Sequence, residues 1–299
     1  MHAPAKLELD AAALTTLALL HQGLNRTIVT SGALNVTQYR VLLKAFEAAE
    51  PARISDLATA LSLRPNVVTQ AADHLERLAL VTRMPHPGDG RSVALAVTPL
   101  GRDRIAAVDA ALTAHLDDVL SPLPPEQAAQ FRGAVESSGA GMERTATTHA
   151  AAVTSSYVTG IAEAHRGVKG VLEQVARVSF TECRVMLNVA EAGNRARVSD
   201  VAAALGLPAS TVTRAVDRLE EKGWARRSND QEDWRAVYIG LTDEGLRLLD
   251  VLRDTLVSFG RWRFYRHLSE QQRDVAYYAN RALAESLLKA HAESANGSG

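Results

Sequence analysis

The chain repeats a segment of 65 residues, and this repeat restricts its fold more than any other feature of the sequence. Residues 37–101 align with residues 181–245 at a constant offset of 144 residues and without a gap, and about 26 of the 65 aligned positions are identical. Five of those identities are alanine, so alanine richness does not produce the match. The period is much longer than the roughly 20–50 residues of a solenoid repeat. We therefore predict two copies of one domain, the first in residues 1–144 and the second in residues 145–299.

The composition agrees with two soluble globular domains. A chain of 299 residues, at roughly 150 residues per domain, predicts two domains independently of the repeat. Hydrophobic residues make up 46% of the chain and charged residues 22%, which are ordinary values for globular proteins. The formal net charge of −1 excludes a polycation and leaves room for a local basic face. Cys183 is the sole cysteine, so a reducing cytoplasm is the expected location.

Several classes of protein are excluded by the residue patterns. The apolar run 11–20 follows Glu8 and Asp10, whereas a secretory signal carries positive charge at that place. No stretch approaches the roughly 18 uncharged apolar residues of a membrane span. The sequence contains no recognisable cluster of metal-ligating residues, nucleophile–base pair or glycine-rich phosphate loop. We therefore expect no membrane association, no metal or other cofactor, and no enzymatic activity.

Hydrophobic periodicity predicts the same order of elements in each copy. In the first copy, helices are expected over residues 10–31, from 37 to about 50, in a short segment after Ser55, over 65–79, from 98 to about 120, and from 126 onward. Residues 80–84 and 92–97 have the pattern of two short strands flanking a turn-rich tip, which predicts a β-hairpin. Ser55 and its counterpart Ser199 are the expected N-caps of the short helix. The fold class is therefore mainly α with small β-hairpin wings.

Two helices joined by a tight turn and followed by a hairpin form a winged helix-turn-helix, here expected in residues 37–101 and again in 181–245. The second helix of the pair fits the major groove of DNA, with its N-terminal turns facing the base edges. If Val68, Ala71 and Leu75 are buried, the opposite face of that helix carries polar residues that suit bases and phosphates. This outward set is Asn66, Thr69, Gln70, Asp73, His74 and Arg77 in the first copy, and Ser210, Thr211, Thr213, Arg214, Asp217 and Arg218 in the second.

Each predicted hairpin carries one arginine near its tip. Arg91 follows Asp89 by two residues, and Arg235 follows Asp233 by two residues. A guanidinium on a thin hairpin can enter a narrow minor groove, where the potential is most negative. The acid can fix the direction of the arginine before DNA binds. We therefore predict that both arginines contact DNA and that both aspartates support them.

Both copies resemble the MarR family of bacterial winged-helix regulators, and the resemblance covers nearly the whole chain twice. The blocks that carry it are Val68-Thr69, Leu75-Glu76, Arg83, Asp89-Gly90-Arg91, Thr98 and Gly101 in the first copy, and Val212-Thr213, Leu219 to Gly223, Arg227, Asp233-Trp234-Arg235, Leu241-Thr242 and Gly245 in the second. The resemblance implies a DNA-binding protein whose first and last helices form a dimerisation platform. It also adds Arg83 and Arg227 to the predicted DNA contacts.

Members of this family are homodimers, whereas here both copies belong to one chain. The resemblance therefore implies a pseudo-dimer that binds double-stranded DNA at a pseudo-palindromic operator, with half-sites about 10 base pairs, or roughly 34 Å, apart. Gln70 and His74 of the first copy correspond to Arg214 and Arg218 of the second, so we expect two non-identical half-sites. The predicted function is transcriptional regulation, with repression as the expected sign.

A second hypothesis keeps the fold without DNA binding in one or both copies. The net charge is +1 over residues 64–91 and zero over residues 208–235, with histidine neutral. The second wing also carries three acids, Asp230, Glu232 and Asp233. On this hypothesis the chain is a ligand-binding or protein-interaction module. The placement of the arginines favours DNA binding.

His21 and His165 lie at equivalent places on two apolar stripes, and they allow two interpretations. One is a buried, hydrogen-bonded histidine of the platform. The other is a polar anchor in a pocket for the small lipophilic or aromatic effector that the resemblance implies. The residues predicted for such a pocket are His21, Asn25 and Arg40 in the first copy, and His165, Lys169 and Arg184 in the second. Cys183, which replaces Tyr39, is expected to be a buried core residue, with thiol-based sensing as the alternative.

Overall fold

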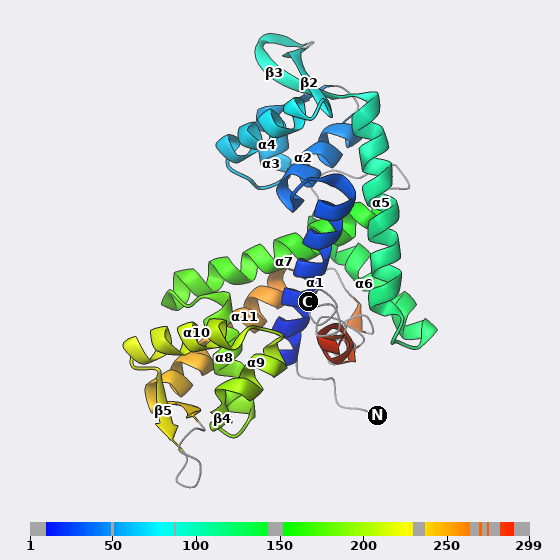
Figure 1. Cartoon of the computed structure of the whole chain (residues 1–299). Coiled ribbons are helices and arrows are strands. Elements are labelled where there is room, and N and C mark those ends of the chain that lie inside the picture. The colour runs from blue at the N-terminus through cyan, green and yellow to red at the C-terminus, as the bar shows by residue number, and fades with distance from the viewer. Residues whose placement is uncertain are drawn as a thin grey trace. The chain divides into compact units, whose positions relative to one another are not determined.

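A computed structural model of the chain describes residues 10–48, 51–86, 88–142, 152–229, 237–263, 269–270, 274 and 282–289. The described part is mostly helical, with small antiparallel sheets (Figure 1). The first copy contains α1 (Ala11–Gly32), α2 (Val36–Glu47), β1 (Ala52–Arg53), α3 (Ile54–Ala60), α4 (Pro65–Arg77), β2 (Val81–His86), β3 (Asp89–Val97), α5 (Pro99–Leu120) and α6 (Pro125–Met142). The second contains α7 (Ala152–Ala176), α8 (Phe180–Glu191), β4 (Ala196–Arg197), α9 (Val198–Leu205), α10 (Ala209–Glu221), β5 (Ala225–Asn229), β6 (Val237–Leu241) and α11 (Asp243–Arg263). The order confirms the predicted fold class, a tandem winged helix-turn-helix.

Each winged helix contains a three-stranded antiparallel sheet, and the two sheets share one register. The strand order is β1-β3-β2 in the first copy and β4-β6-β5 in the second. Ala52 pairs with Leu95 in the first copy, and Ala196 pairs with Ile239 in the second. Both residues of the second pair lie 144 positions after their counterparts in the first. The β2–β3 and β5–β6 hairpins keep the same offset. The sequence repeat is therefore also a repeat of strand pairing.

The short third helix of each copy begins earlier than predicted. Helix α3 begins at Ile54 after the N-cap residue Arg53, so Ser55 lies inside the first turn and is not the N-cap. Ser199 is likewise not the N-cap of α9, because Arg197 holds that position. The reason is strand pairing: Arg53 and Arg197 are the last residues of β1 and β4, so each is extended and the helix begins at the next residue.

The described residues form two compact units that exchange helical segments. The first-copy unit consists of Leu20–Ser121 and Ala128–Glu163, and the second-copy unit consists of Met1–Leu19, Pro122–Gln127 and Ala164–Gly299. The division therefore falls inside α1 and inside α7. The boundary between residues 144 and 145 remains a prediction about the sequence repeat.

In the second-copy unit, the first turns of α1 contribute to the core of the second winged helix. Ala11 and Leu14 of α1 belong to the same hydrophobic cluster as Leu172 of α7 and Val212 of α10. The backbone N–H of Ala11 also donates a hydrogen bond to Glu191 at the end of α8, at 2.8 Å. The core of this unit is therefore assembled from both copies of the repeat.

In the first-copy unit, a buried ion pair joins α2 to the middle of α7. The Arg40 Nη2 atom lies 2.7 Å from Glu163 Oε1, and both side chains are at least nine-tenths buried. Ions that leave water in this way need close partners, because the desolvation cost of each is several kcal/mol. The pair therefore fixes a helix of the second copy against the first winged helix.

We expect Glu163→Ala to lower the free energy of unfolding of the first-copy unit by about 3–5 kcal/mol, because Arg40 then remains buried without its carboxylate. Urea unfolding followed by circular dichroism measures the change. Asp117→Ala is the matched control: it removes an ion pair with Arg132 that is also short, at 2.5 Å, but in which Asp117 is 59% exposed. The control should cost at most about 1 kcal/mol. Equal losses in the two variants would contradict the assignment.

Candidate nucleic-acid interface

Helix α4 has one buried and one exposed face, as the sequence predicts. Pro65 is its first residue, where the absent N–H leaves no hydrogen bond unmade. The buried residues are Val68, Ala71, Ala72 and Leu75. Of the predicted outward set, Asn66, Thr69, Gln70, Asp73 and Arg77 are exposed and His74 is half-buried. The orientation of the helix is confirmed, and the contact of these residues with DNA remains a prediction.

Helix α10 repeats this arrangement in the second copy. Its buried residues are Val212, Ala215, Val216 and Leu219. Of the predicted outward set, Ser210, Thr213, Arg214, Asp217 and Arg218 are exposed and Thr211 is half-buried. The two helices therefore present polar residues at the same helical positions.

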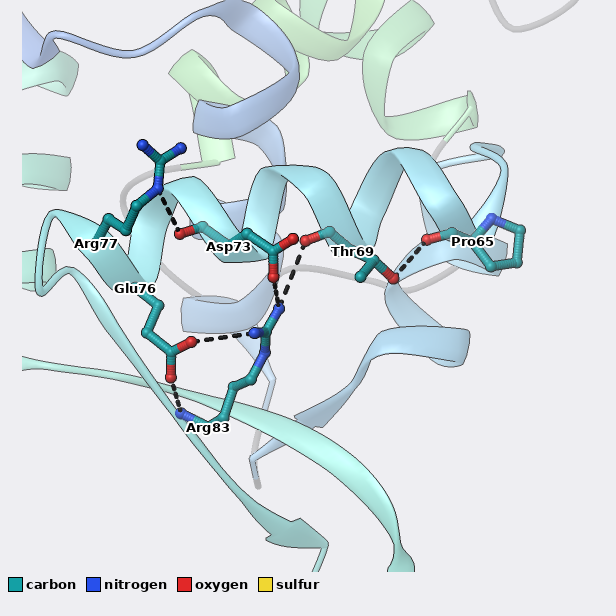
Figure 2. Close-up of polar contacts among 6 residues, drawn as sticks. All are labelled: Pro65, Thr69, Asp73, Glu76, Arg77 and Arg83. Atoms are coloured by element: carbon teal, nitrogen blue, oxygen red, sulfur yellow. Dashed lines mark hydrogen bonds and ion pairs between the residues drawn. The ribbon is translucent and has the colours of Figure 1, made fainter.

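Arg83 on β2 is bound to the exposed face of α4 (Figure 2). Its guanidinium forms ion pairs with Asp73 and, at 3.1 Å, with Glu76, and Nη2 also lies 3.5 Å from the carbonyl oxygen of Thr69. The backbone N–H of Arg83 donates to the other oxygen of Glu76 at 3.3 Å. One arginine thus fastens the hairpin to the helix and forms ion pairs with two of its acids.

Arg227 on β5 makes the same set of contacts in the second copy. Its guanidinium pairs with Glu220 and, at 2.7 Å, with Asp217, and it donates to the carbonyl oxygen of Thr213 at 3.2 Å. Its backbone N–H donates to Glu220 at 2.7 Å. All four residues lie 144 positions after their counterparts in the first copy. We call each set of one strand arginine and two helix acids a strand–helix clamp.

The clamps change how the predicted contacts Arg83 and Arg227 are understood. Their side chains are 29% and 28% exposed, and their charge is directed to carboxylates of the same fold. A DNA phosphate would have to compete with these carboxylates. The sequence offered one sign of the clamp, because the spacing of Asp73, Glu76 and Arg83 recurs unchanged in the second copy.

The wing arginines are outside the part of the structure that can be described in atomic detail. The backbone of Asp89 and Arg91 belongs to β3, and their side chains lie outside the described atoms. Asp233 and Arg235 lie outside the described residues, as do Asp230 and Glu232. The minor-groove contact of both arginines stays a prediction.

The T-x-x-G sequence after each hairpin has a structural cause. The Thr98 hydroxyl accepts a hydrogen bond from the N–H of Gly101 at 3.0 Å, which caps α5, and it donates to the carbonyl oxygen of Ala79 at 2.8 Å. A β-carbon at Gly101 would overlap the carbonyl oxygen of Leu80. The second copy repeats these relations with Thr242, Gly223 and Gly245. The motif therefore fixes the end of the recognition helix against the next helix.

The second copy has a further polar link between its recognition helix and α8. Glu182 is 2% exposed, and its Oε2 atom lies 3.1 Å from Lys222 Nζ while Oε1 lies 3.8 Å from Arg218 Nη1. Lys222 also donates to the carbonyl oxygen of Arg177 at 2.9 Å. The corresponding residues of the first copy are Gln38, His74 and Leu78. Sequence reasoning missed Glu182, although an acid facing a lysine one helix away could be found by comparing the copies.

The six residues predicted for effector binding, three in each copy, lie in different environments. Asn25 and Lys169 are exposed, His21 and His165 are half-buried, and Arg40 and Arg184 are buried. The His165 ring lies 5.0 Å from the ring of Phe180. Arg40 is bound to Glu163, as described above. The histidines are therefore less enclosed than a core interpretation expects, and the pocket remains a prediction.

Arg184 differs from its counterpart Arg40 in the partner that it contacts. Leu19 occupies the position of Glu163 in the repeat, and Arg184 Nη2 instead donates to the carbonyl oxygen of Leu205 at 2.5 Å and to the Thr15 hydroxyl at 3.3 Å. Burial lowers the pKa of Arg184 to about 10. The guanidinium is therefore held by neutral oxygens at this place.

Cys183 is buried, as predicted. Burial raises the pKa of its thiol to about 12, and the charge of Arg253 acts in the opposite direction with a smaller effect. The thiolate is the reactive form of cysteine, and it is scarce at neutral pH when the pKa is high. These properties favour the core residue over the sensor.

No group of three or more metal-ligating side chains that could hold an ion occurs among the residues that the structure describes. Within that same part of the chain, none of the helices has the length and apolar character that a bilayer span requires.

We expect Gly245→Ala to destabilise the second-copy unit by about 1–3 kcal/mol, because the added methyl group meets a backbone carbonyl that cannot rotate away. Gly170→Ala is the control, since a β-carbon there meets nothing within 4 Å in an exposed part of α7. The control should be neutral or stabilising by up to about 1 kcal/mol. Differential scanning calorimetry of both variants checks the pair, and similar shifts in both would contradict the role of the glycine.

We also expect Cys183 to be unreactive in the native protein. At pH 8, well below a pKa of about 12, Ellman's reagent should modify the thiol many times more slowly in buffer than in 8 M urea. Rapid stoichiometric modification of the folded protein would contradict the assignment as a core residue.

Comparison with known proteins places the fold in a family. The HTH-type transcriptional regulator PecS of Dickeya dadantii is 46% identical over 52 residues, which are 17% of this chain and 31% of PecS. The uncharacterised HTH-type transcriptional regulator YfiV of Bacillus subtilis is 38% identical over 52 residues, 17% of this chain and 32% of YfiV. The matched segment therefore spans about a third of these relatives.

The chain is also similar to two solved structures over less than half of its length. Sco3205, a MarR family transcriptional regulator from Streptomyces coelicolor in complex with DNA, is 26% identical with a TM-score of 0.42, covering 48% of this chain and 90% of that one. MarR from E. coli is 18% identical with a TM-score of 0.36, covering 40% of this chain and 85% of that one. Two sequence models described as MarR family match residues 34–93 and 178–236. The chain is a MarR family protein that carries the winged-helix segment of the family twice, in tandem.

Proposed function

We propose that the chain is a DNA-binding transcriptional regulator that reads duplex DNA with α4 and α10. The observation that carries the proposal is the repetition of one exposed polar face at the same helical positions in both copies, each following a tight turn and fastened to a hairpin by a strand–helix clamp. Membership of the MarR family supports it. Two relatives named as HTH-type transcriptional regulators support it for the segment they share.

We further propose that one chain acts as a pseudo-dimer. The two copies supply two recognition helices, which suits a pseudo-palindromic operator with half-sites about 10 base pairs apart. The exchange of helical segments at α1 and α7 supports this arrangement, because it makes each unit depend on both copies. The proposed location is the cytoplasm, where DNA is accessible to such a protein.

The sign of regulation and the effector belong to the same proposal. The chain acts as a repressor, and a small lipophilic or aromatic ligand releases it from DNA. The proposed ligand contacts are His21, Asn25 and Arg40 in the first-copy unit, or their counterparts His165, Lys169 and Arg184 in the second-copy unit. Two of them, Arg40 and Arg184, already hold polar partners inside the fold.

A second candidate function is a ligand-binding or protein-interaction module without DNA contact. The clamps favour this candidate to a limited degree, because Arg83 and Arg227 form ion pairs with carboxylates of the same fold and are less available to phosphates. Electrophoretic retardation of the duplex upstream of its own coding region, at low and at physiological salt, separates the two functions. Absence of retardation at both salt concentrations would support the second candidate.

We expect the double variant Arg91→Ala/Arg235→Ala to bind its operator more weakly by about 1–3 kcal/mol for each well-formed contact. Fluorescence anisotropy at one fixed salt concentration measures the loss. Arg132→Ala is the control, since this arginine lies on α6 in an ion pair with Asp117. Unchanged affinity in the double variant would refute the wing contacts.

A further inference from the structure

Two residues at the same position of the two recognition helices, Gln70 and Arg214, differ in the base that they can recognise. We propose that Gln70 selects adenine and Arg214 selects guanine at the equivalent position of the two half-sites. They would then be the residues that make the operator asymmetric. The inference rests on the proposed function, because it concerns the sequence that α4 and α10 read.

Both residues occupy the part of the helix that reaches base edges. Gln70 is the sixth residue of α4, and Arg214 is the sixth residue of α10. Each follows a buried valine by two positions, which turns it about 200° away from the core at 3.6 residues per turn. Both side chains are exposed. A side chain in the second turn of a recognition helix faces the floor of the major groove.

Two neighbouring outward positions carry the same residue in both copies, Thr69 with Thr213 and Asp73 with Asp217, and cannot distinguish the half-sites. The Thr69 hydroxyl donates to the carbonyl oxygen of Pro65 at 3.0 Å, and the Thr213 hydroxyl donates to that of Ala209 at 2.9 Å. Their protons are used within the helix, so both present a methyl group and an acceptor. One turn further, Asp73 and Asp217 are both held by the strand–helix clamps.

The outward position 74/218, in the last turn of each helix, carries different residues in the two copies, but both residues have partners within the fold. His74 Nδ1 lies 3.2 Å from Arg77 Nη2, and Arg218 Nη1 lies 3.8 Å from the buried Glu182. Near the start of each helix, Asn66 corresponds to Ser210, and both have short side chains. Among these positions, 70/214 is the one in the second helical turn that carries a long side chain in both copies.

Gln70 and Arg214 are also available for an external partner. Neither has a hydrogen bond or ion pair with another residue in the described part of the chain. A glutamine amide matches adenine N6 and N7 with one donor and one acceptor, whereas a guanidinium matches guanine O6 and N7 with two donors. One such bidentate pair discriminates against a wrong base by about 5- to 150-fold.

The test exchanges the two residues and measures base preference. A pool of duplexes with a random central region is first selected with the wild-type protein to obtain its binding site. Four duplexes are then made that differ at the position read by residue 70 or 214: adenine with guanine, adenine in both half-sites, guanine in both, and an unrelated pyrimidine in both. Wild type, Gln70→Arg, Arg214→Gln and the double exchange are titrated against all four.

We expect wild type to favour the adenine–guanine duplex by about 5- to 150-fold over either symmetric duplex. Gln70→Arg should favour guanine in both half-sites, and Arg214→Gln should favour adenine in both. The double exchange should regain the preference for the adenine–guanine duplex, which it binds in the reversed orientation. Loss of fold cannot produce this recovery, and urea unfolding of all four proteins should be alike because both positions are exposed.

Three results would overturn the inference or its basis, and they are distinguishable. If each exchange changes affinity for all four duplexes by the same factor, the side chains contact phosphates and the base assignment is wrong. If Gln70→Arg shifts preference and Arg214→Gln does not, the second copy does not read this base. If the wild-type protein selects no duplex from the pool even at low salt, the proposed function itself fails.

Discussion

The ion pairs between a strand arginine and two acids of the recognition helix are the interaction on which both winged helices depend. An unpaired aspartate on the face of α4 or α10 would repel phosphate more strongly than one in an ion pair. Arg83 and Arg227 each pair with such an aspartate and also link the hairpin to its recognition helix, in addition to the T-x-x-G contacts. Arg227 makes the same contacts as Arg83, 144 residues later, which indicates that the duplication preserved a working geometry and not only a hydrophobic pattern.

Hydrophobic periodicity predicted the buried faces of the helices, which depend on local spacing. It did not predict features that depend on contacts between distant segments. The stripe of Val68, Ala71 and Leu75 and the order of elements followed from helical spacing alone. The start of α3 did not, because strand pairing holds Arg53 extended and places Ser55 inside the helix. The direction of Arg83 could not be read from its type, since an arginine suits a phosphate and a carboxylate equally well. The exchange of segments inside α1 and α7 has no local signal, because it depends on which distant surface each helix covers.

The differences between the copies show what fusion permits. In a homodimer a substitution appears in both subunits, whereas here a residue of one copy can be replaced while its counterpart in the other copy is kept. Arg40 is paired with Glu163, but Arg184 is held by neutral oxygens because Leu19 stands in the corresponding place. Tyr39 donates a hydrogen bond to Asp109, and their counterparts are Cys183 and Arg253. Both partners of a contact have changed in that case, which is the pattern expected when a partly buried polar pair is replaced as a unit.

The same freedom extends to the exposed faces of α4 and α10. Because each clamp holds two acids and one arginine at the same positions, the electrostatic background of the two helices stays similar while the outward residues diverge. The net charge is only +1 over residues 64–91 and zero over residues 208–235, and attraction to the phosphate backbone grows with the number of phosphates neutralised. A few well-placed side chains therefore carry more of the recognition than bulk charge does. A face with one glutamine and a face with one arginine at the same position are two readers of different bases on one scaffold, and a single chain that carries both gives its binding site a direction that a homodimer cannot give.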